Sequence, residues 1–250
     1  IIGGFSKAHR KNSSNNSVLN YIPGYLSNGI YAELRKLKPW IKPKKYSVCF
    51  IGGEKKEKIT TGLKYLIKSY SYVIPCGVVL NSFLKFLNYN IGLSKTHKLE
   101  EIKILNTVFK KYKKKLILPD HCIVTLKNNF KKRRLSKINQ VKKNELIAGF
   151  KLNSKMKNIL KKCISKESHI LLAGTPSMVS NNFNEPSFEI LRYIKKNRTK
   201  SLLLGGDTIS DLPYDGMKSS GGGSALHYLS NKDLPIIEGL YKNQKKFNVI

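Results

Sequence analysis

The stretch Ser47-Val48-Cys49-Phe50-Ile51-Gly52-Gly53 decides the fold class of this chain. Val48 to Ile51 is apolar on both faces, as a buried parallel strand must be, and two glycines follow it directly. Beyond the glycines, apolar residues recur at helical spacing from Ile59 to Tyr70. A buried strand, a tight turn and an amphipathic helix form the unit from which parallel sheets with covering helices are built.

The same alternation continues toward the C-terminus. Strand-like runs at 72–74, 116–118, 122–124, 170–173 and 201–204 alternate with helical periodicity over 99–112, 152–163 and 188–194. We therefore predict an α/β fold with an open, mostly parallel, Rossmann-like sheet and helices on both faces. We assign this domain to residues 44–250.

Two segments depart from that rhythm. Residues 1–43 are expected to form a strand or loop and then a linker helix, capped by Ser27 or Asn28 and ending at Leu37. Residues 127–143 contain Lys and Arg but no acid, and they are expected to form a basic insertion, either an exposed loop or a hairpin.

Composition limits the function classes. The 250 residues carry 47 Lys and Arg against 15 Asp and Glu, a formal net charge of +32, and 40% of them are hydrophobic. The apolar fraction excludes wholesale disorder, and no run approaches the roughly 20 apolar residues of a membrane span. The basic excess favours a polyanionic partner. The alternative is codon drift toward A and T, which favours Lys over Arg and leaves lysines on solvated faces, although drift does not explain the shortage of acids.

The cysteines and the first residues bear on compartment. The four cysteines show no CxxC or CxxH spacing, which argues against zinc, and they are expected to be buried thiols of a reducing compartment. The start at Ile1 lacks a Met and a secretory signal, which indicates either a processed chain or a start within a longer protein, so we expect that upstream sequence is missing.

Three glycine clusters follow predicted strands or turns, where open parallel sheets bind ligands. Glycine lets the backbone approach a phosphate closely, and a carboxylate such as Asp207 can hold Mg²⁺. A tight strand-to-helix turn alone would produce the same residues. The clusters are Gly52-Gly53, Gly205-Gly206-Asp207-Thr208 and Gly221-Gly222-Gly223-Ser224.

Together with other stretches, these clusters resemble the nucleotide-binding C-terminal half of phosphoglycerate kinases, with the strand and linker helix that precede it. The resemblance lies in Ala8-His9-Arg10 with Ser13-Ser14, Pro23 to Leu34, Phe50 to Lys55, Leu116 to Asp120, Gly205 to Thr208 and Ser219 to Ser224. It implies that Lys55 contacts the transferred phosphoryl group, Asp207 the metal of MgATP or MgADP, and Gly221 to Gly223 the phosphates. It implies that Arg10 helps to clamp the substrate.

The chain also departs from the family pattern. The segment Glu54 to Lys58 is one residue short, Pro75-Cys76-Gly77 stands where glycines are expected, and residues are added before Glu185. Leu204 replaces another glycine, and nothing supplies the lobe that binds the phosphoglycerate. We therefore expect a noncatalytic, kinase-derived module with no bound cofactor.

The basic segments then indicate a partner. They offer phosphate contacts without a base-reading motif, so we expect binding to structured RNA such as ribosomal RNA, beside neighbouring ribonucleoprotein subunits. An organellar ribosome in the mitochondrial, or else plastid, matrix fits this best, with a cytoplasmic location left open. Two alternatives are a divergent phosphoglycerate kinase that binds MgATP or MgADP and whose substrate lobe is absent from this chain, and a nucleotide sensor without turnover. The expected RNA contacts are Lys110, Lys111, Lys113, Lys114, Lys115, Lys131, Lys132, Arg133 and Arg134.

Overall fold

The computed structural model describes residues 1–230 and 233–248 and is built around a parallel sheet of five strands. The predicted fold class is confirmed. Strand order is β2-β1-β6-β7-β8, so that β1 is flanked by β2 on one side and by β6 on the other. The strands are β1 (Val48–Ile51), β2 (Tyr72–Pro75), β6 (Ile170–Ala173), β7 (Ser201–Leu204) and β8 (Met217–Ser219).

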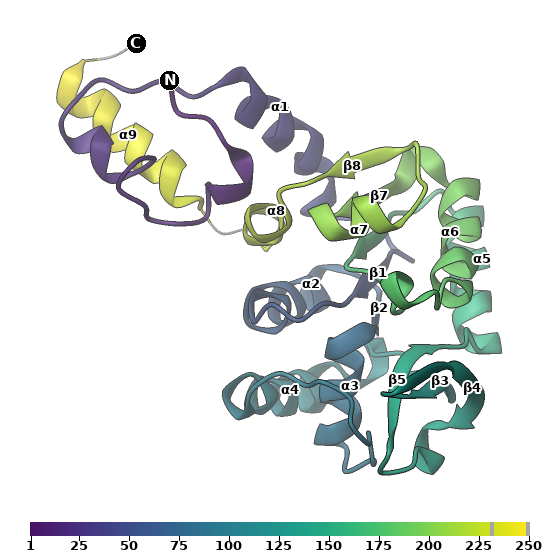
Figure 1. Ribbon diagram of the computed structural model, residues 1–250. Coiled ribbons are helices and arrows are strands. Elements are labelled where there is room, and N and C mark those ends of the chain that lie inside the picture. The colour runs from purple at the N-terminus through teal and green to yellow at the C-terminus, as the bar shows by residue number, and fades with distance from the viewer. Residues whose placement is uncertain (231–232, 249–250) are drawn as a thin grey trace.

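Helices cover both faces of this sheet (Figure 1). The π-helical turn η4 (Lys58–Leu63) with α2 (Lys64–Ser69), and also α4 (Leu99–Tyr112) and α8 (Gly222–Leu229), lie on one face, while α5 (Ser154–Ser165) and α6 (Glu185–Lys196) lie on the other. Alternate strand residues enter the two cores: Cys49 and Ile51 pack toward α2, whereas Val48 and Phe50 pack toward α5. Because both faces are covered, every residue of β1 is fully buried.

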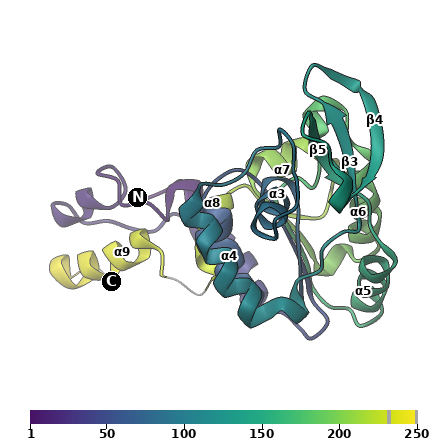
Figure 2. The ribbon, with the colours of Figure 1, turned by 90° about the horizontal axis from the view of Figure 1, so that it is seen from below.

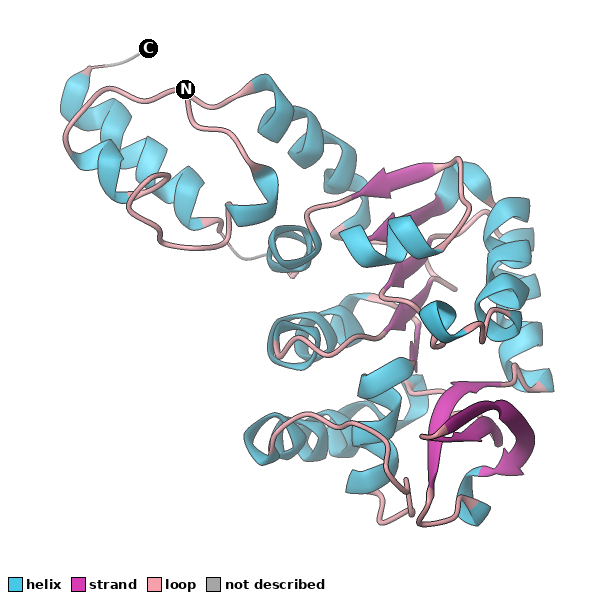
Figure 3. Ribbon diagram, viewed as in Figure 1, coloured by secondary structure: helices cyan, strands magenta, loops and turns pink. Residues whose placement is uncertain are grey.

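A second, antiparallel sheet of three strands lies beside α3 (Gly77–Phe86) and α6 (Figure 3). Its order is β4-β3-β5, with β3 (His121–Leu126), β4 (Asn129–Lys137) and β5 (Glu145–Phe150). The run at 122–124 therefore belongs to this smaller sheet, and the run at 116–118 contributes one bridge from Leu116 to Val73. The basic segment 127–143 forms a hairpin arm, which was one of its two expected forms.

The two ends of the chain pack together, away from the sheet (Figures 1 and 2). Residues 1–27 hold two short 3₁₀ turns and a single bridge from Ile2 to Leu26, and α9 (Pro235–Phe247) lies against them. Asn243 of α9 donates to the carbonyls of Leu19 and Ile22 and accepts from Gly24 N–H. The helix α1 (Asn28–Leu37) follows, capped by Ser27 as predicted. Within the described ranges, no helix is both long enough and apolar enough to cross a bilayer.

Candidate functional site

The carboxyl ends of β1, β2 and β6 lie side by side, with β1 between β2, the next strand in the chain, and β6, which follows much later. Gly174 has a φ of +125°, and a Cβ built there would lie 2.2 Å from the carbonyl oxygen of Gly52. A Cβ on Gly52 would in turn lie 2.6 Å from Cys76 Sγ. Only glycine permits these approaches. In open α/β sheets such a switch point is the ordinary place for a ligand.

Lys58 reaches into this switch point from the start of η4. Its Nζ donates to the Ala173 carbonyl at 3.0 Å, and its methylenes pack against Gly53, whose φ is +110°. The pKa of Lys58 is lowered to about 8, chiefly by burial; nearby Lys55 contributes to the fall, and Asp207 acts in the opposite direction. An ammonium has three protons to donate, and one of them is used here.

No buried counter-charge accompanies that ammonium in the described part of the chain. The nearby Cys76 thiol has a pKa raised by burial to about 12, and burial also raises the pKa of Cys49, so both thiols are neutral at physiological pH. No ion pair of Lys58 occurs among the described residues. A largely buried cation without a partner is costly, so this position favours an anionic ligand.

The sequence pointed to Lys55 rather than to Lys58. The Lys55 side chain is exposed and forms no hydrogen bond or ion pair with the described residues. The loop after β1 is one residue shorter than the family pattern. Counting forward from Gly53 therefore leads to Lys55, whereas counting back from Ile59, the first buried residue of the following helix, leads to Lys58. The position of Lys58 relative to that helix is the sequence signal that could have identified it.

The turn after β7 presents a free carboxylate. Gly205 has a φ of +113° and leads into the short helix α7 (Gly206–Asp211). Gly206 is exposed, with nothing within 4 Å of where its Cβ would lie, and Asp207 is exposed without a described hydrogen bond or ion pair. Thr208 is buried beneath this turn. Asp207 acts on the pKa of Lys58, which places the two groups at the same edge of the sheet.

The third glycine cluster is occupied by the N-terminal segment. A Cβ on Gly221 would lie 2.3 Å from the Phe5 ring, and one on Gly223 would lie 2.7 Å from the His9 ring. His9 Nδ1 also lies 2.8 Å from Ser224 Oγ. These two glycines are therefore explained by side-chain packing, while Gly222 lies against the backbone of Gly205.

Arg10 comes to the same side of the molecule through its neighbour His9. Burial lowers the pKa of His9, as do Arg10 and His227, whereas Glu57 in the turn after β1 raises it. The Arg10 side chain itself is exposed. The carboxyl edge thus gathers the twelve residues singled out for nucleotide, metal or substrate: Arg10, Gly52, Gly53, Lys55, Gly205, Gly206, Asp207, Thr208, Gly221, Gly222, Gly223 and Ser224.

Three of the nine residues expected to contact RNA are engaged within the fold. Lys115 donates to the carbonyls of Ile67, Lys68 and Tyr70 at 2.9–3.0 Å, where it caps the end of α2. The other two are Arg133 and Arg134, both on β4.

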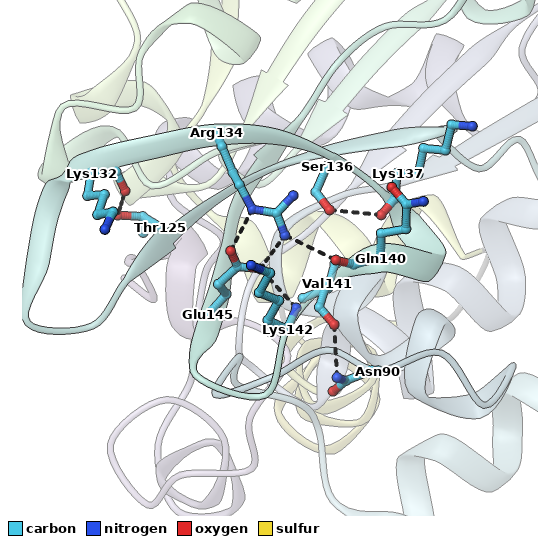
Figure 4. A network of polar contacts seen from close by, with 10 residues as sticks. All are labelled: Asn90, Thr125, Lys132, Arg134, Ser136, Lys137, Gln140, Val141, Lys142 and Glu145. Atoms are coloured by element: carbon cyan, nitrogen blue, oxygen red, sulfur yellow. Dashed lines mark hydrogen bonds and ion pairs between the residues drawn. The ribbon is translucent and has the colours of Figure 1, made fainter.

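The two arginines hold β4 in place. Arg134 forms a two-pronged ion pair with the buried Glu145 on β5, at 2.6 and 2.7 Å, and donates to the Gln140 carbonyl (Figure 4). Arg133 donates to the Asn182 carbonyl at 3.0 Å, and its guanidinium lies 4.3 Å from the centre of the Phe183 ring. Neither guanidinium is free to serve mainly as a phosphate contact.

The remaining basic residues of these stretches form two separate groups. Lys110, Lys111, Lys113 and Lys114 are exposed near the start of β2, at the amino edge of the sheet. Lys131 and Lys132 are exposed on the arm that Arg133 ties to the loop after β6, on the carboxyl side. The two groups therefore lie toward opposite edges.

A cavity of about 300 Å³ lies between β4 and α6, away from the glycine turns. Arg133, Phe150, Phe183, Glu185 and Glu189 line it, together with other residues of the arm. None of the predicted glycine-turn residues borders it. The distinctive chemistry of the molecule is instead the Lys58 ammonium and the Asp207 carboxylate at the switch point.

Comparison with known proteins agrees with this architecture. The family model for phosphoglycerate kinase matches residues 1–232. The chain belongs to the phosphoglycerate kinase family. A phosphoglycerate kinase of Baumannia cicadellinicola is 27% identical over 258 residues, covering 98% of this chain and 64% of that protein, and one of a Wolbachia strain from Drosophila simulans is 23% identical. The chain spans about 63% of the length of such relatives.

Solved structures of the family share its fold. The phosphoglycerate kinase of Coxiella burnetii superposes with a TM-score of 0.78 at 24% identity, over 95% of this chain and 64% of that one. The enzyme of Pyrococcus horikoshii superposes with a TM-score of 0.77 at 18% identity. The resemblance to the C-terminal lobe of phosphoglycerate kinases is thereby confirmed.

Proposed function

We propose that this chain is the nucleotide-binding lobe of a phosphoglycerate kinase and that it holds MgADP or MgATP at the carboxyl edge of its sheet. The observation that carries this proposal is the Lys58 ammonium, which is largely buried at the switch point, has no ion-pair partner among the described residues and has two protons free. A phosphate would supply the missing negative charge. This proposal replaces our expectation of a noncatalytic module as the function that the site supports best.

The residues at the edge fit such a ligand in three respects. Lys58 can donate to phosphate oxygens, the backbone beside Gly206 is open to close approach, and Asp207 is a free oxygen donor for Mg²⁺. When bound, the nucleotide supplies the phosphoryl group. The protein contributes position and charge neutralisation, which is most of what phosphoryl transfer requires.

In two other respects the site differs from the family pattern. The Cys76 side chain packs where glycine is expected, and Phe5 and His9 cover Gly221 and Gly223. Because the Phe5 and His9 side chains fill the space beside the glycines that follow β8, we place the phosphates nearer to Lys58 and Gly206 than to the third glycine cluster. Arg10 stands at the same side, available to an acidic second substrate.

Thermal unfolding with and without MgADP tests the proposal. We expect MgADP to raise the melting temperature of the wild type, because a ligand that binds only the folded state stabilises it. Lys58→Met should abolish this rise, and Asp207→Asn should abolish the part that requires Mg²⁺. Lys56→Met, at an exposed lysine two residues away, serves as the matched control and should keep the full rise. No rise in the wild type would refute the proposal.

A second candidate function rests on the net charge of +32 and the six exposed lysines of the predicted stretches. In this reading the chain is a noncatalytic, RNA-contacting subunit of a ribonucleoprotein such as a mitochondrial ribosome. Binding to ribosomal RNA that weakens steeply with salt, in a protein that MgADP does not stabilise, would favour it over the kinase lobe.

A further inference from the structure

The amino edge of the five-stranded sheet lies opposite the switch point. In a parallel α/β sheet the covering helices end, and the strands begin, at this edge. The topology therefore brings the segment before β1 together with the last turns of α2, α4 and α5. We call this region, together with the rest of α2 and the length of α5 that adjoins it, the amino-edge surface and define it by residues 42–46, 64–71, 110–115 and 155–166.

The four segments that define the amino-edge surface contain many lysines and no acid. Not one Asp or Glu occurs in its four segments, and Glu167 is the first acid to follow them. Lys115 and Lys157 are half-buried, and Lys157 forms an ion pair with Glu189 of α6 at 2.8 Å; the other lysines of the surface are exposed. The lysines of the four segments are Lys42, Lys44, Lys45, Lys64, Lys68, Lys110, Lys111, Lys113, Lys114, Lys115, Lys155, Lys157, Lys161, Lys162 and Lys166.

The electrostatic effect of these lysines reaches the adjoining interior. His169 stands at the start of β6, where its ring packs edge-on against Trp40 and its Nδ1 accepts from Lys44 N–H. Burial lowers the pKa of His169 to about 4, and the charges of Lys200 and Lys44 contribute to the fall. This edge is therefore strongly positive even before a partner binds.

Tyr46 stands on this surface in a strained conformation. Its φ is +71°, in the left-handed region that a bulky residue rarely adopts, and its N–H donates to Ser71 Oγ at 2.9 Å. Lys162 Nζ lies 4.5 Å from the centre of its ring, and Lys45 Nζ lies 5.5 Å from it. Backbone strain of this kind persists only where the surroundings enforce it, and it is concentrated at functional positions.

A hollow of about 470 Å³ adjoins Tyr46 on the same surface. Tyr72, Lys155, Asn158, Ile159 and Lys162 line it. Lys162 belongs both to this lining and to the contact with Tyr46, so the hollow and the strained ring form one continuous feature. Two half-buried tyrosines stand among several ammonium groups and one amide.

Lysines at helix ends have another effect, because they stabilise the helix dipole. Lys115 does this directly at the end of α2. Helix dipoles do not explain the strained Tyr46 or the hollow beside Tyr72, which lie at the starts of strands. Aromatic rings among lysines are the combination that stacks unpaired bases and neutralises the phosphates between them.

We propose that the amino-edge surface binds a single-stranded segment of nucleic acid, with one base on Tyr46, a neighbouring base in the hollow beside Tyr72, and the phosphates on Lys45, Lys155 and Lys162. This inference is independent of the nucleotide site at the carboxyl edge. It shares with the second candidate function only the kind of partner, a nucleic acid, and it states where on the molecule that partner binds.

Fluorescence anisotropy of a labelled uridine-rich RNA strand tests the proposal. We expect the wild type to bind it with an affinity that falls by at least tenfold between about 50 and about 200 mM salt. Lys162→Gln and Tyr46→Gly should each weaken binding by about tenfold. Glycine at position 46 also removes the backbone strain, so a loss of binding there is not a loss of folding.

Two controls separate this site from general charge attraction. The double substitution Lys131→Gln with Lys132→Gln removes two exposed charges on the carboxyl side and should change the affinity by less than about twofold. Equal losses in this double variant and in Lys162→Gln would overturn the proposal, as would tighter binding of duplex RNA than of the single strand. Comparable binding of a DNA strand of the same sequence would support a site that does not read the 2′-hydroxyl.

The MgADP shift is measured on the same variants. It should be unchanged in Tyr46→Gly and Lys162→Gln, because both residues lie at the edge opposite Lys58. A protein that responds to MgADP but shows no RNA affinity at about 50 mM salt would refute the amino-edge proposal alone. One that binds RNA without responding to MgADP would refute the nucleotide proposal alone.

Discussion

Replacing Lys58 with Met should make the protein more stable while removing its response to nucleotide. The pKa of Lys58 falls from an ordinary 10.5 to about 8 in the fold. Because one unit of pKa corresponds to about 1.4 kcal/mol, keeping this amine charged at pH 7 costs the folded state about 3 kcal/mol. A methionine of similar length fills the space without the charge.

Little is lost in exchange. The ammonium donates to the Ala173 carbonyl, but that carbonyl also accepts from Gly52 N–H at 3.1 Å and so keeps a partner. The lost hydrogen bond is worth about 1 kcal/mol. We therefore expect Lys58→Met to raise the free energy of unfolding by about 2 kcal/mol at pH 7.

The pH dependence provides the sharper test, measured by urea unfolding from pH 7 to pH 10. Between about pH 8 and about pH 10 the folded wild type releases the Lys58 proton while the unfolded chain keeps it. The unfolded state then binds more protons, so the stability of the wild type rises with pH and approaches that of the variant. Lys56→Met should follow the wild type throughout. A variant that is less stable than the wild type at pH 7, with a difference that does not change up to pH 10, would refute the unpaired ammonium.

Three further predictions concern the contacts that hold the site and the arm in place. Gly174→Ala should lower the free energy of unfolding, measured by urea titration, by about 2–5 kcal/mol, because the φ of +125° and the Gly52 oxygen at 2.2 Å leave no room for a Cβ. Gly206→Ala has open space around it and should cost under about 0.5 kcal/mol in the same titration. Glu145→Gln should lower the free energy of unfolding by about 1–3 kcal/mol at pH 7, a modest value because Arg134 remains 39% exposed. Because the Arg134 hydrogen bond lowers the pKa of Glu145, this loss should shrink as the pH falls below about 4 and the carboxylate of the wild type is protonated. Equal losses at pH 7 and pH 3 would contradict this prediction. Lys115→Met should speed hydrogen exchange at the end of α2, whereas Lys114→Met should leave it unchanged, and equal protection in both variants would show that the cap contributes nothing.

The five-stranded sheet was predictable because its signals are local. Val48 to Ile51 is apolar on both faces and is followed by glycines, and the helix after it shows its buried face at regular spacing. The cap of α1 was visible for the same reason, since Ser27 bonds to an N–H three residues away. Patterns of this range do not reveal which sheet a strand joins, so the separation of β3 from the main sheet was not visible.

The site was less predictable because its residues are sorted by distant contacts. Lys55 and Lys58 are both lysines of one loop, and only the carbonyl of Ala173, 115 residues from Lys58, distinguishes them. Arg134 is one more basic residue until β5 brings Glu145 beside it. The third glycine cluster was ambiguous in principle, because a missing Cβ admits a phosphate or an aromatic ring equally well, and here Phe5 and His9 take the space.

The net charge of +32 does not by itself choose between a nucleotide and a nucleic acid, because both are anions. The sheet separates them. Acids such as Glu54, Glu57 and Asp207 stand among the cations of the carboxyl edge, which therefore accepts one compact anion together with a metal. The four segments of the amino-edge surface contain no acid, only Lys157 among their lysines forms a described ion pair, with Glu189, and this surface suits an extended chain of phosphates. Because the two edges lie at opposite ends of the same strands, occupying one does not require emptying the other. A kinase lobe and an RNA-binding surface are thus compatible in one molecule, and the excess of lysine over acid bears mainly on the second.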